Sequence, residues 1–170
     1  MALTARVTIE PMRLEDVTAV HGIERLSFTT PWPAYAFEQE LRGNRLARYL
    51  VARAGDAVVG FAGLWLMVDE AHITTFSVHP DWRRQGIGRQ LLVSLVELAI
   101  EISARRMTLE VRVSNEAARA LYRSFGFEVT GRRPRYYTDD HEDALVMTTP
   151  ELTDPLIVRV LAAERARQAR

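Results

Sequence analysis

The sequence predicts a single mixed α/β domain, because strand-like and helix-like segments alternate along its 170 residues. Residues 107–113 alternate apolar and polar side chains, as a strand with one buried face does. Apolar residues of 87–102 instead recur every three or four positions, as on an amphipathic helix. A Gly55-Asp56 turn joins two further strand-like segments. The expected order is strand, two helices, three strands, helix, strand, helix and two strands, which excludes a helical bundle or a β-sandwich.

The individual elements follow from the period of the apolar residues and from the turn residues between them. Strands are expected at 7–10, 49–54, 58–68, 71–78, 107–113, 128–133 and 144–148, and helices at 13–27, 34–42, 87–102 and 116–125. In the first helix, Ile23 and Leu26 should face the core. Two prolines around Trp32 exclude helix there and stiffen the loop. Ser114-Asn115 offers a cap to the last helix, and Gly126 a C-terminal stop.

Composition limits the possible functions. The 22 basic residues balance 22 acidic ones, so a broad attraction to nucleic acid or to a membrane surface is not indicated. The chain contains no Cys, which excludes disulfides, a cysteine nucleophile and thiolate metal sites. No apolar run is long enough to cross a membrane, and the N-terminus lacks a signal-peptide core. We therefore expect a soluble, cytoplasmic protein.

The C-terminal residues 151–170 differ in character from the domain expected at 1–150. Asp154-Pro155 is a good helix N-cap and first-turn pair. An apolar stripe follows, ahead of an arginine-rich end; it comprises Leu156, Ile157, Val160 and Leu161. We expect an amphipathic helical tail that docks back on the domain or on a partner.

A glycine-containing segment joins the strand at 71–78 to the helix at 87–102, and its sequence is Arg83-Arg84-Gln85-Gly86-Ile87-Gly88-Arg89. Glycines let the backbone pass close to a ligand, and the amides of a helix's first turn carry partial positive charge. Together with the arginines they predict a diphosphate site. A dinucleotide fingerprint would need glycine at Leu91, and a nucleotide P-loop would need Gly-Lys followed by Ser or Thr. The remaining alternative is a plain tight turn.

The pattern Arg-x-x-Gly-x-Gly after a strand resembles the coenzyme A diphosphate loop of the GNAT acyltransferases. Residues from about Thr8 to Thr149 are similar to the bacterial ribosomal-protein-alanine N-acetyltransferases, the RimI type of that superfamily. The matching motifs are Ile23-Glu24 through Phe28, Pro31-Trp32, Asp69-Glu70-Ala71, Leu109-Glu110-Val111-Arg112 with Ser114-Asn115, Ala120-Leu121-Tyr122 with Phe125-Gly126-Phe127, Tyr136-Tyr137 and Glu142-Asp143-Ala144. Two segments depart from the family pattern, namely Arg133-Pro134-Arg135 and the chain after Pro150.

The resemblance implies the GNAT fold, in which one mixed, mostly antiparallel central sheet has helices on both faces and holds acetyl-CoA in the splay between its two central strands. It also implies direct transfer of acetyl from acetyl-CoA to an amine, with Glu110 as base and Tyr122 as acid. The residues expected to contact the cofactor are Phe76, Ser77, Val78, the loop from Arg83 to Arg89, Asn115, Ala118 and Tyr122.

Physical chemistry is consistent with these two roles. An ammonium is not a nucleophile, so a base must take its proton, and burial of Glu110 can raise its pKa toward working pH. At pH 7, deprotonation costs about 1.4 kcal/mol for an amino terminus of pKa about 8, but about 4.6 kcal/mol for a lysine. A phenol, with a pKa near 10, is a sensible proton donor to a thiolate. Spacing alone leaves two alternatives: a solvent-facing Glu110 and a Tyr122 that only packs in the core.

Rigid aromatic residues are candidates for the walls of a peptide groove, because they bury area at low entropic cost, although aromatics more often pack in cores. These candidates are Pro31, Trp32, Tyr136 and Tyr137. The histidines lack metal-ligand spacing; they are His21, His72, His79 and His141. Residues 139–143 are most simply a solvated acidic loop. We expect no metal.

The resemblance thus predicts acetylation of a protein N-terminus, with the N-terminal alanine of a small-subunit ribosomal protein as acceptor. No nucleic-acid or membrane partner is expected, and the oligomeric state is left open. One alternative is an acetyltransferase for a lysine, other N-termini or a small amine. Another is a non-catalytic module that senses acetyl-CoA or holds a partner, which the presence of both Glu110 and Tyr122 argues against.

Overall fold

The computed structural model describes residues 6–170, and the elements occur in the predicted order. The strands are β1 (Val7–Pro11), β2 (Ala47–Ala54), β3 (Ala57–Met67), β4 (Glu70–Val78), β5 (Arg106–Arg112), β6 (Glu128–Arg133) and β7 (Ala144–Thr148). The helices are α1 (Val17–Ser27), α2 (Ala34–Gly43), α3 (Ile87–Glu101), α4 (Glu116–Ser124) and α5 (Pro155–Gln168), with 3₁₀ turns η1 (Leu14–Asp16) and η2 (Pro80–Trp82). None of the helices in residues 6–170 is long and apolar enough to cross a membrane.

The strands form one seven-stranded sheet in the order β1-β2-β3-β4-β5-β7-β6. Strands β4 and β5 pair in parallel, whereas β1 with β2, β2 with β3, β5 with β7, and β6 with β7 pair antiparallel. The parallel pairing joins Glu70–His72 to Arg106–Thr108 and stops there, although β4 runs on to Val78 and β5 to Arg112. The mixed, mostly antiparallel sheet predicted from the sequence is confirmed.

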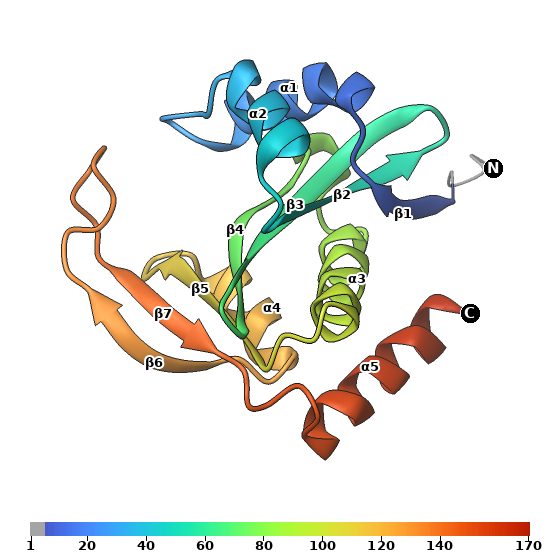
Figure 1. Ribbon diagram of the computed structural model, residues 1–170, viewed down its shortest axis with the longest axis vertical. Coiled ribbons are helices and arrows are strands. Elements are labelled where there is room, and N and C mark those ends of the chain that lie inside the picture. The colour runs from blue at the N-terminus through green and yellow to red at the C-terminus, as the bar shows by residue number, and fades with distance from the viewer. Residues whose placement is uncertain (1–5) are drawn as a thin grey trace. The chain divides into compact units, whose positions relative to one another are not determined.

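The chain divides into two compact units, and the first contains the residues up to Trp65 together with Thr74–Leu95. In this unit α1 and α2 cover one face of β2 and β3 (Figure 1). Phe37 of α2 packs edge-on against Phe61 of β3, with ring centroids 5.8 Å apart. On the opposite face of β3, a Cβ added to Gly60 would lie 3.2 Å from Leu91 of α3. Helices therefore pack on both faces of this part of the sheet, and the first turns of α3 lie against β3 on the face opposite α2.

Helix α1 shows where the predicted burial pattern was incomplete. Val17, Val20, Ile23 and Glu24 are buried, whereas Leu26 is 61% exposed, so the expectation that Leu26 faces the core is wrong. At 100° per residue, Leu26 lies about 120° around the helix from Val20, outside the apolar stripe. The buried stripe instead contains a carboxylate, Glu24, which is 5% exposed.

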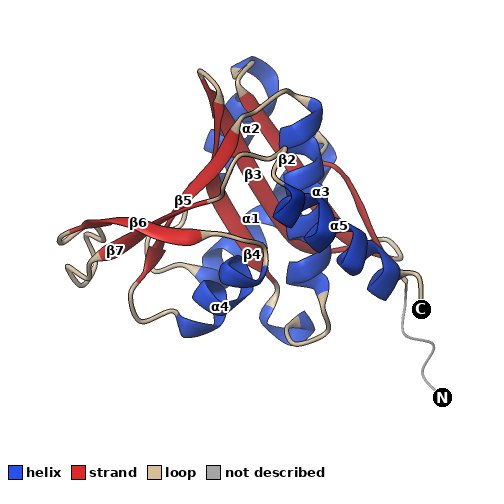
Figure 2. Cartoon of the chain, turned by 90° about the horizontal axis from the view of Figure 1, so that it is seen from below, coloured by secondary structure: helices blue, strands red, loops and turns tan. Residues whose placement is uncertain are grey.

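The second unit contains Leu66–Ile73 and Val96–Arg170. Strands β6 and β7 run side by side, as Figure 2 shows, and β7 pairs in turn with β5. Helix α4 ends at Ser124 with Phe125 as its C-cap, and the next residue, Gly126, has a φ of 90°, which glycine adopts readily, as predicted for the C-terminal stop. A Cβ at Gly126 would also lie 3.3 Å from both Leu156 and Ile157 of α5.

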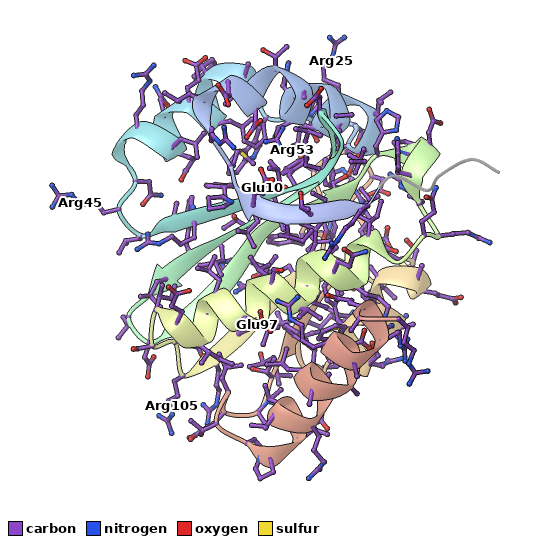
Figure 3. All side chains as sticks on the ribbon, turned by 90° about the vertical axis from the view of Figure 1, so that its right-hand side faces the viewer. Glu10, Arg25, Arg45, Arg53, Glu97 and Arg105 are labelled. Carbon is purple, nitrogen blue, oxygen red and sulfur yellow. The ribbon has the colours of Figure 1, made fainter. Side chains whose placement is uncertain are left out.

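Helix α5 is attached to other elements of the second unit. Asp154 caps it by accepting a hydrogen bond from the Leu156 N–H at 2.8 Å, as the sequence indicated. Ile157 is 1% exposed, whereas Leu156 is 40% exposed, so the apolar stripe is only partly covered. Near the C-terminus, the Arg165 guanidinium pairs with Glu97 on α3, which faces α5 in Figure 3. The C-terminal helix thus docks on its own unit.

Candidate active site

The glycine loop of the first unit runs from η2 into the first turn of α3. Arg84 and Gly86 adopt left-handed backbone conformations, with φ of 61° and 80°. Such conformations are uncommon for residues other than glycine, and they allow successive backbone N–H groups to converge on an anion. The helix proper begins when the Gln90 N–H reaches the Gly86 carbonyl at 3.1 Å. The loop therefore combines two left-handed backbone conformations with nearby arginines.

The end of β4 is held by contacts from two sides. The Arg83 Nε donates a hydrogen bond to the Val78 carbonyl at 3.0 Å, which ties the loop back to the strand. The Ser77 hydroxyl, which is buried, donates to Ser27 of α1 at 2.6 Å. Of the three strand residues predicted to face a pantetheine arm, Phe76, Ser77 and Val78, the last thus already uses its carbonyl oxygen within the protein.

In the second unit, one carboxylate is held between two basic side chains. Glu110 of β5 approaches His72 of β4, with Oε2 2.5 Å from the His72 Nε2, and Arg133 at the end of β6, with Oε1 3.2 Å from the Arg133 Nε. The sheet register explains the first contact: His72 pairs with Thr108, and residues two apart on a strand point to the same face. An ionised carboxylate only accepts hydrogen bonds, so the imidazole N–H donates.

These partners determine the charge state of Glu110. Its side chain is 12% exposed. The hydrogen bond from His72 lowers the pKa of Glu110 below its ordinary value, and the Arg133 guanidinium adds to this effect, outweighing the opposing effect of burial. The expectation that burial raises the Glu110 pKa toward working pH is therefore wrong. The carboxylate stays ionised at neutral pH and can accept a hydrogen bond or a proton there.

Tyr122 and Asn115 occupy different environments on α4. Tyr122 is buried, 6% exposed, and burial raises its pKa well above the ordinary value, with the nearby Tyr137 contributing. Its hydroxyl therefore holds a proton at any working pH. Asn115 is exposed and caps the helix by accepting a hydrogen bond from the Ala118 N–H at 3.2 Å. That bond uses the side-chain oxygen of Asn115 and not its amide nitrogen.

Tyr136 and Tyr137 follow β6. Their rings meet edge to face at 5.1 Å, and the Arg112 guanidinium lies 3.9 Å from the centre of the Tyr137 ring. Burial raises the pKa of Tyr137 to about 12. The exposed acidic loop beside them is ordered by ion pairs, because Asp139, Asp140 and Glu142 all contact Arg112. The acidic residues of the predicted solvated loop thus hold the arginine that stacks on Tyr137.

Pro31 and Trp32 belong to the first unit. The backbone N–H of Trp32 donates to the Glu24 Oε1 at 3.1 Å. The Trp32 ring centroid lies 5.6 Å from that of Phe37. Trp32 borders a surface groove along α2, whereas Pro31 is exposed and is not part of the groove's lining. The predicted aromatic walls thus occur as two separate pairs, Pro31 with Trp32 and Tyr136 with Tyr137.

The sequence prediction missed two residues beside Glu110. His72 was considered only as a metal ligand, and Arg133 only as a departure from the family pattern. The available signal was the alternation of β4, which places His72 on the face opposite the buried Ala71 and Ile73. That signal does not reveal which strand lies next to β4. Within residues 6–170, no group of three or more His, Asp or Glu side chains is arranged to hold a metal ion.

Comparison with known proteins identifies the family. The profile described as the acetyltransferase (GNAT) family matches residues 17–127. A Bacillus subtilis (strain 168) relative, provisionally named a [ribosomal protein bS18]-alanine N-acetyltransferase, is 44% identical over 85% of this chain and 96% of its own length. The Escherichia coli (strain K12) enzyme of that name is 36% identical over 84% of this chain and 97% of its own. A crystal structure of the Escherichia coli ribosomal-protein-S18-alanine N-acetyltransferase superposes with a TM-score of 0.78 at 33% identity, covering 85% of this chain and 94% of that one. The chain therefore belongs to the acetyltransferase (GNAT) family and is an N-acetyltransferase that uses acetyl-CoA.

Proposed function

We propose that this enzyme acetylates the α-amine of a protein N-terminus, and that its acceptor is the N-terminal alanine of a small-subunit ribosomal protein. The observation that carries the proposal is the similarity, over most of both chains, to relatives named for that reaction. A ribosomal acceptor would place the enzyme in the cytoplasm. The GNAT domain would comprise residues 1–150, with 151–170 as an added C-terminal helix.

In the proposed reaction, the amine nitrogen attacks the acetyl carbonyl of acetyl-CoA, the new C–N bond forms and the C–S bond breaks. Glu110 takes the proton that the amine loses, and Tyr122 gives its hydroxyl proton to the departing thiolate. His72 holds the carboxylate of Glu110 in place through the 2.5 Å hydrogen bond. Burial keeps the Tyr122 hydroxyl protonated until the thiolate forms, while its raised pKa makes the phenol a weaker acid than a solvated tyrosine.

Substrate binding is assigned to separate groups. We assign the diphosphate of acetyl-CoA to the loop amides and arginines of residues 83–89, supported by the left-handed conformations at Arg84 and Gly86. The pantetheine arm is assigned to the backbone of Phe76–Val78, and Asn115 and Ala118 at the start of α4 to further coenzyme contacts. Tyr136 and Tyr137 are assigned to the acceptor peptide.

The lowered pKa of Glu110 favours an α-amine over a lysine as acceptor. A carboxylate that binds its proton weakly is a weak base, so the acceptor must give up its proton cheaply. At pH 7 that cost is about 1.4 kcal/mol for an amino terminus but about 4.6 kcal/mol for a lysine side chain. The difference of about 3 kcal/mol is more than a hundredfold in the fraction of reactive amine.

The test is an acceptor screen with acetyl-CoA. Short peptides that begin with Ala, Ser or Met, a peptide with an internal lysine and a blocked N-terminus, and spermidine are compared by thiol release and mass spectrometry. We expect acetylation of the α-amine of the Ala peptide, with no product when that amine is blocked. Acetylation of lysine or spermidine alone would overturn the acceptor, and coenzyme binding without any transfer would overturn catalysis.

A further inference from the structure

A groove runs along α2 in the first unit, and it is bordered by Trp32, one of the residues predicted to line a peptide groove. Its volume is about 560 Å³, within the range of about 300–1,000 Å³ that small-ligand sites occupy. Three aromatic side chains border it: Trp32 before α2, Tyr35 in the first turn of α2, and Trp65 of β3. The small residues Ala36 and Gly43 also line the groove, and they fill little of its space.

The groove contains one carboxylate whose orientation is fixed. The Glu40 Oε2 accepts hydrogen bonds from the Asn44 Nδ2 at 2.7 Å and from the Trp65 Nε1 at 3.2 Å. Neither of these bonds uses Oε1. Tyr49 lies close by, and burial together with the charge of Glu40 raises the pKa of Tyr49 to about 12.

In the part of the chain that the structure describes, no basic side chain forms an ion pair with this carboxylate. The groove lining includes one acidic residue, Glu40, and no basic residue. Arg48 of β2 is not in the lining, and its Nη1 donates to the carbonyls of Arg45 and Ala47 at 2.9 Å each. Glu40 therefore combines a fixed orientation with an uncompensated charge.

Core packing explains only part of this arrangement. Trp32 and Trp65 pack against the hydrophobic core of the first unit, so their apolar surfaces have a structural use. Tyr35 does not, since it is 63% exposed. The exposed Tyr35 ring and the Glu40 carboxylate thus border the same groove without being used by the core.

We propose that this groove binds an arginine side chain presented by a partner protein. Aromatic faces attract cations, and a guanidinium stacks on them while donating hydrogen bonds to a carboxylate. Arginine suits the groove better than lysine because its planar, weakly hydrated head can contact an aromatic ring and Glu40 together. The charge complementarity between the guanidinium and Glu40 identifies the occupant.

The test uses a probe that cannot be acetylated. An N-acetylated, C-amidated Gly-Arg-Gly-Arg-Gly peptide is titrated into the full-length protein, and chemical shifts of the indole N–H groups of Trp32 and Trp65 are followed. We expect saturable binding that shifts both indoles. The same peptide with citrulline for arginine keeps the shape and loses the charge, and it should bind at least about tenfold more weakly.

Two variants complete the test. Glu40→Gln keeps the acceptor for Asn44 and Trp65 but removes the charge, and should weaken binding at least about tenfold. Glu38→Gln makes the same change at an exposed position of α2 outside the groove lining and should leave binding unchanged. Equal binding of the citrulline peptide, or of Glu40→Gln with thermal stability like the parent's, would overturn the proposal. So would the absence of saturable binding to the parent, whatever the outcome of the acetylation assay.

Discussion

Two carboxylates, Glu24 in the first unit and Glu110 in the second, are both largely buried, yet their pKa values move in opposite directions. Glu24 is 5% exposed and accepts one hydrogen bond, from the Trp32 N–H, so burial dominates and raises its pKa. Glu110 faces His72 and Arg133, and these partners lower its pKa. Burial alone therefore does not set the charge of a carboxylate, because the partners around it decide the sign of the shift.

The difference separates a carboxylate that anchors a loop from the one that we propose as the catalytic base. Glu24 Oε2 is buried without a hydrogen-bond partner in the described residues, while Oε1 fixes the backbone of the Pro31–Pro33 loop. Its charged form is disfavoured, and an anchor does not need that charge. Glu110 is kept charged in a partly buried position, an arrangement typical of groups that interact with a substrate.

The largest effect is expected for Glu110→Gln, which preserves shape and cannot accept a proton. We expect kcat/KM to fall by about 10²- to 10⁴-fold, the usual contribution of a general base. Because the pKa of Glu110 is lowered, the deficit should persist from neutral into mildly acidic pH. Steady-state kinetics across pH, with acetyl-CoA affinity measured in parallel, provide the check.

Glu10→Gln is the matched control for this substitution. Glu10 also has a lowered pKa, because Arg53 contacts it at 3.0 Å, and the two lie side by side in Figure 3. It lies on β1, outside the candidate site, so its replacement should leave kcat/KM unchanged. If Glu110→Gln turned over as fast as Glu10→Gln at every pH, Glu110 would not be the base.

The sequence was sufficient to predict the features that depend on local patterns. Apolar periodicity located the strands and helices, Asp154 and Gly126 marked helix ends, and the glycine loop fell at the start of α3. The alternation of β5 placed Glu110 off the apolar face of its strand. Each of these features depends on residues that are close together in the chain.

The environment of Glu110 was not predictable in the same way. His72 is separated from Glu110 by 38 residues and meets it only because β4 and β5 are parallel neighbours in a particular register. Without that register, burial was the only effect that could be anticipated, and it gave the wrong sign for the pKa of Glu110. Glu24 was missed for a related reason, because an apolar stripe does not predict a buried carboxylate.

An intermediate effect, on stability, is expected for Glu24→Gln. A carboxyl whose pKa is raised in the folded state contributes stability below its unfolded pKa, and this stability is lost as pH rises through the folded pKa. The parent should lose stability through this group as the pH rises above about 4.5, and a glutamine, which does not titrate, should not. The free energy of unfolding of the variant should therefore rise relative to the parent's by on the order of 1 kcal/mol, an ordinary size for one substitution.

Urea unfolding of both proteins at several pH values measures this difference. Glu38→Gln, at an exposed position, serves as the control and should show no such trend. A stability difference between Glu24→Gln and the parent that stayed constant with pH, or fell as pH rose, would show that burial does not raise the pKa of Glu24.

The smallest effect is expected for Arg133→Gln, which makes the surroundings of Glu110 more like those of Glu24. Arg133 is 56% exposed, and such an exposed pair contributes about 0–1 kcal/mol, so kcat/KM at high pH should change by less than about tenfold. The pKa of Glu110 should rise once this cation is gone, and the acid limb of the kcat/KM profile should move to higher pH. Arg132→Gln, which removes a pair with Asp143 instead, should leave the limb in place. An acid limb that stayed in place, as in Arg132→Gln, would mean that Arg133 does not act on the pKa of Glu110.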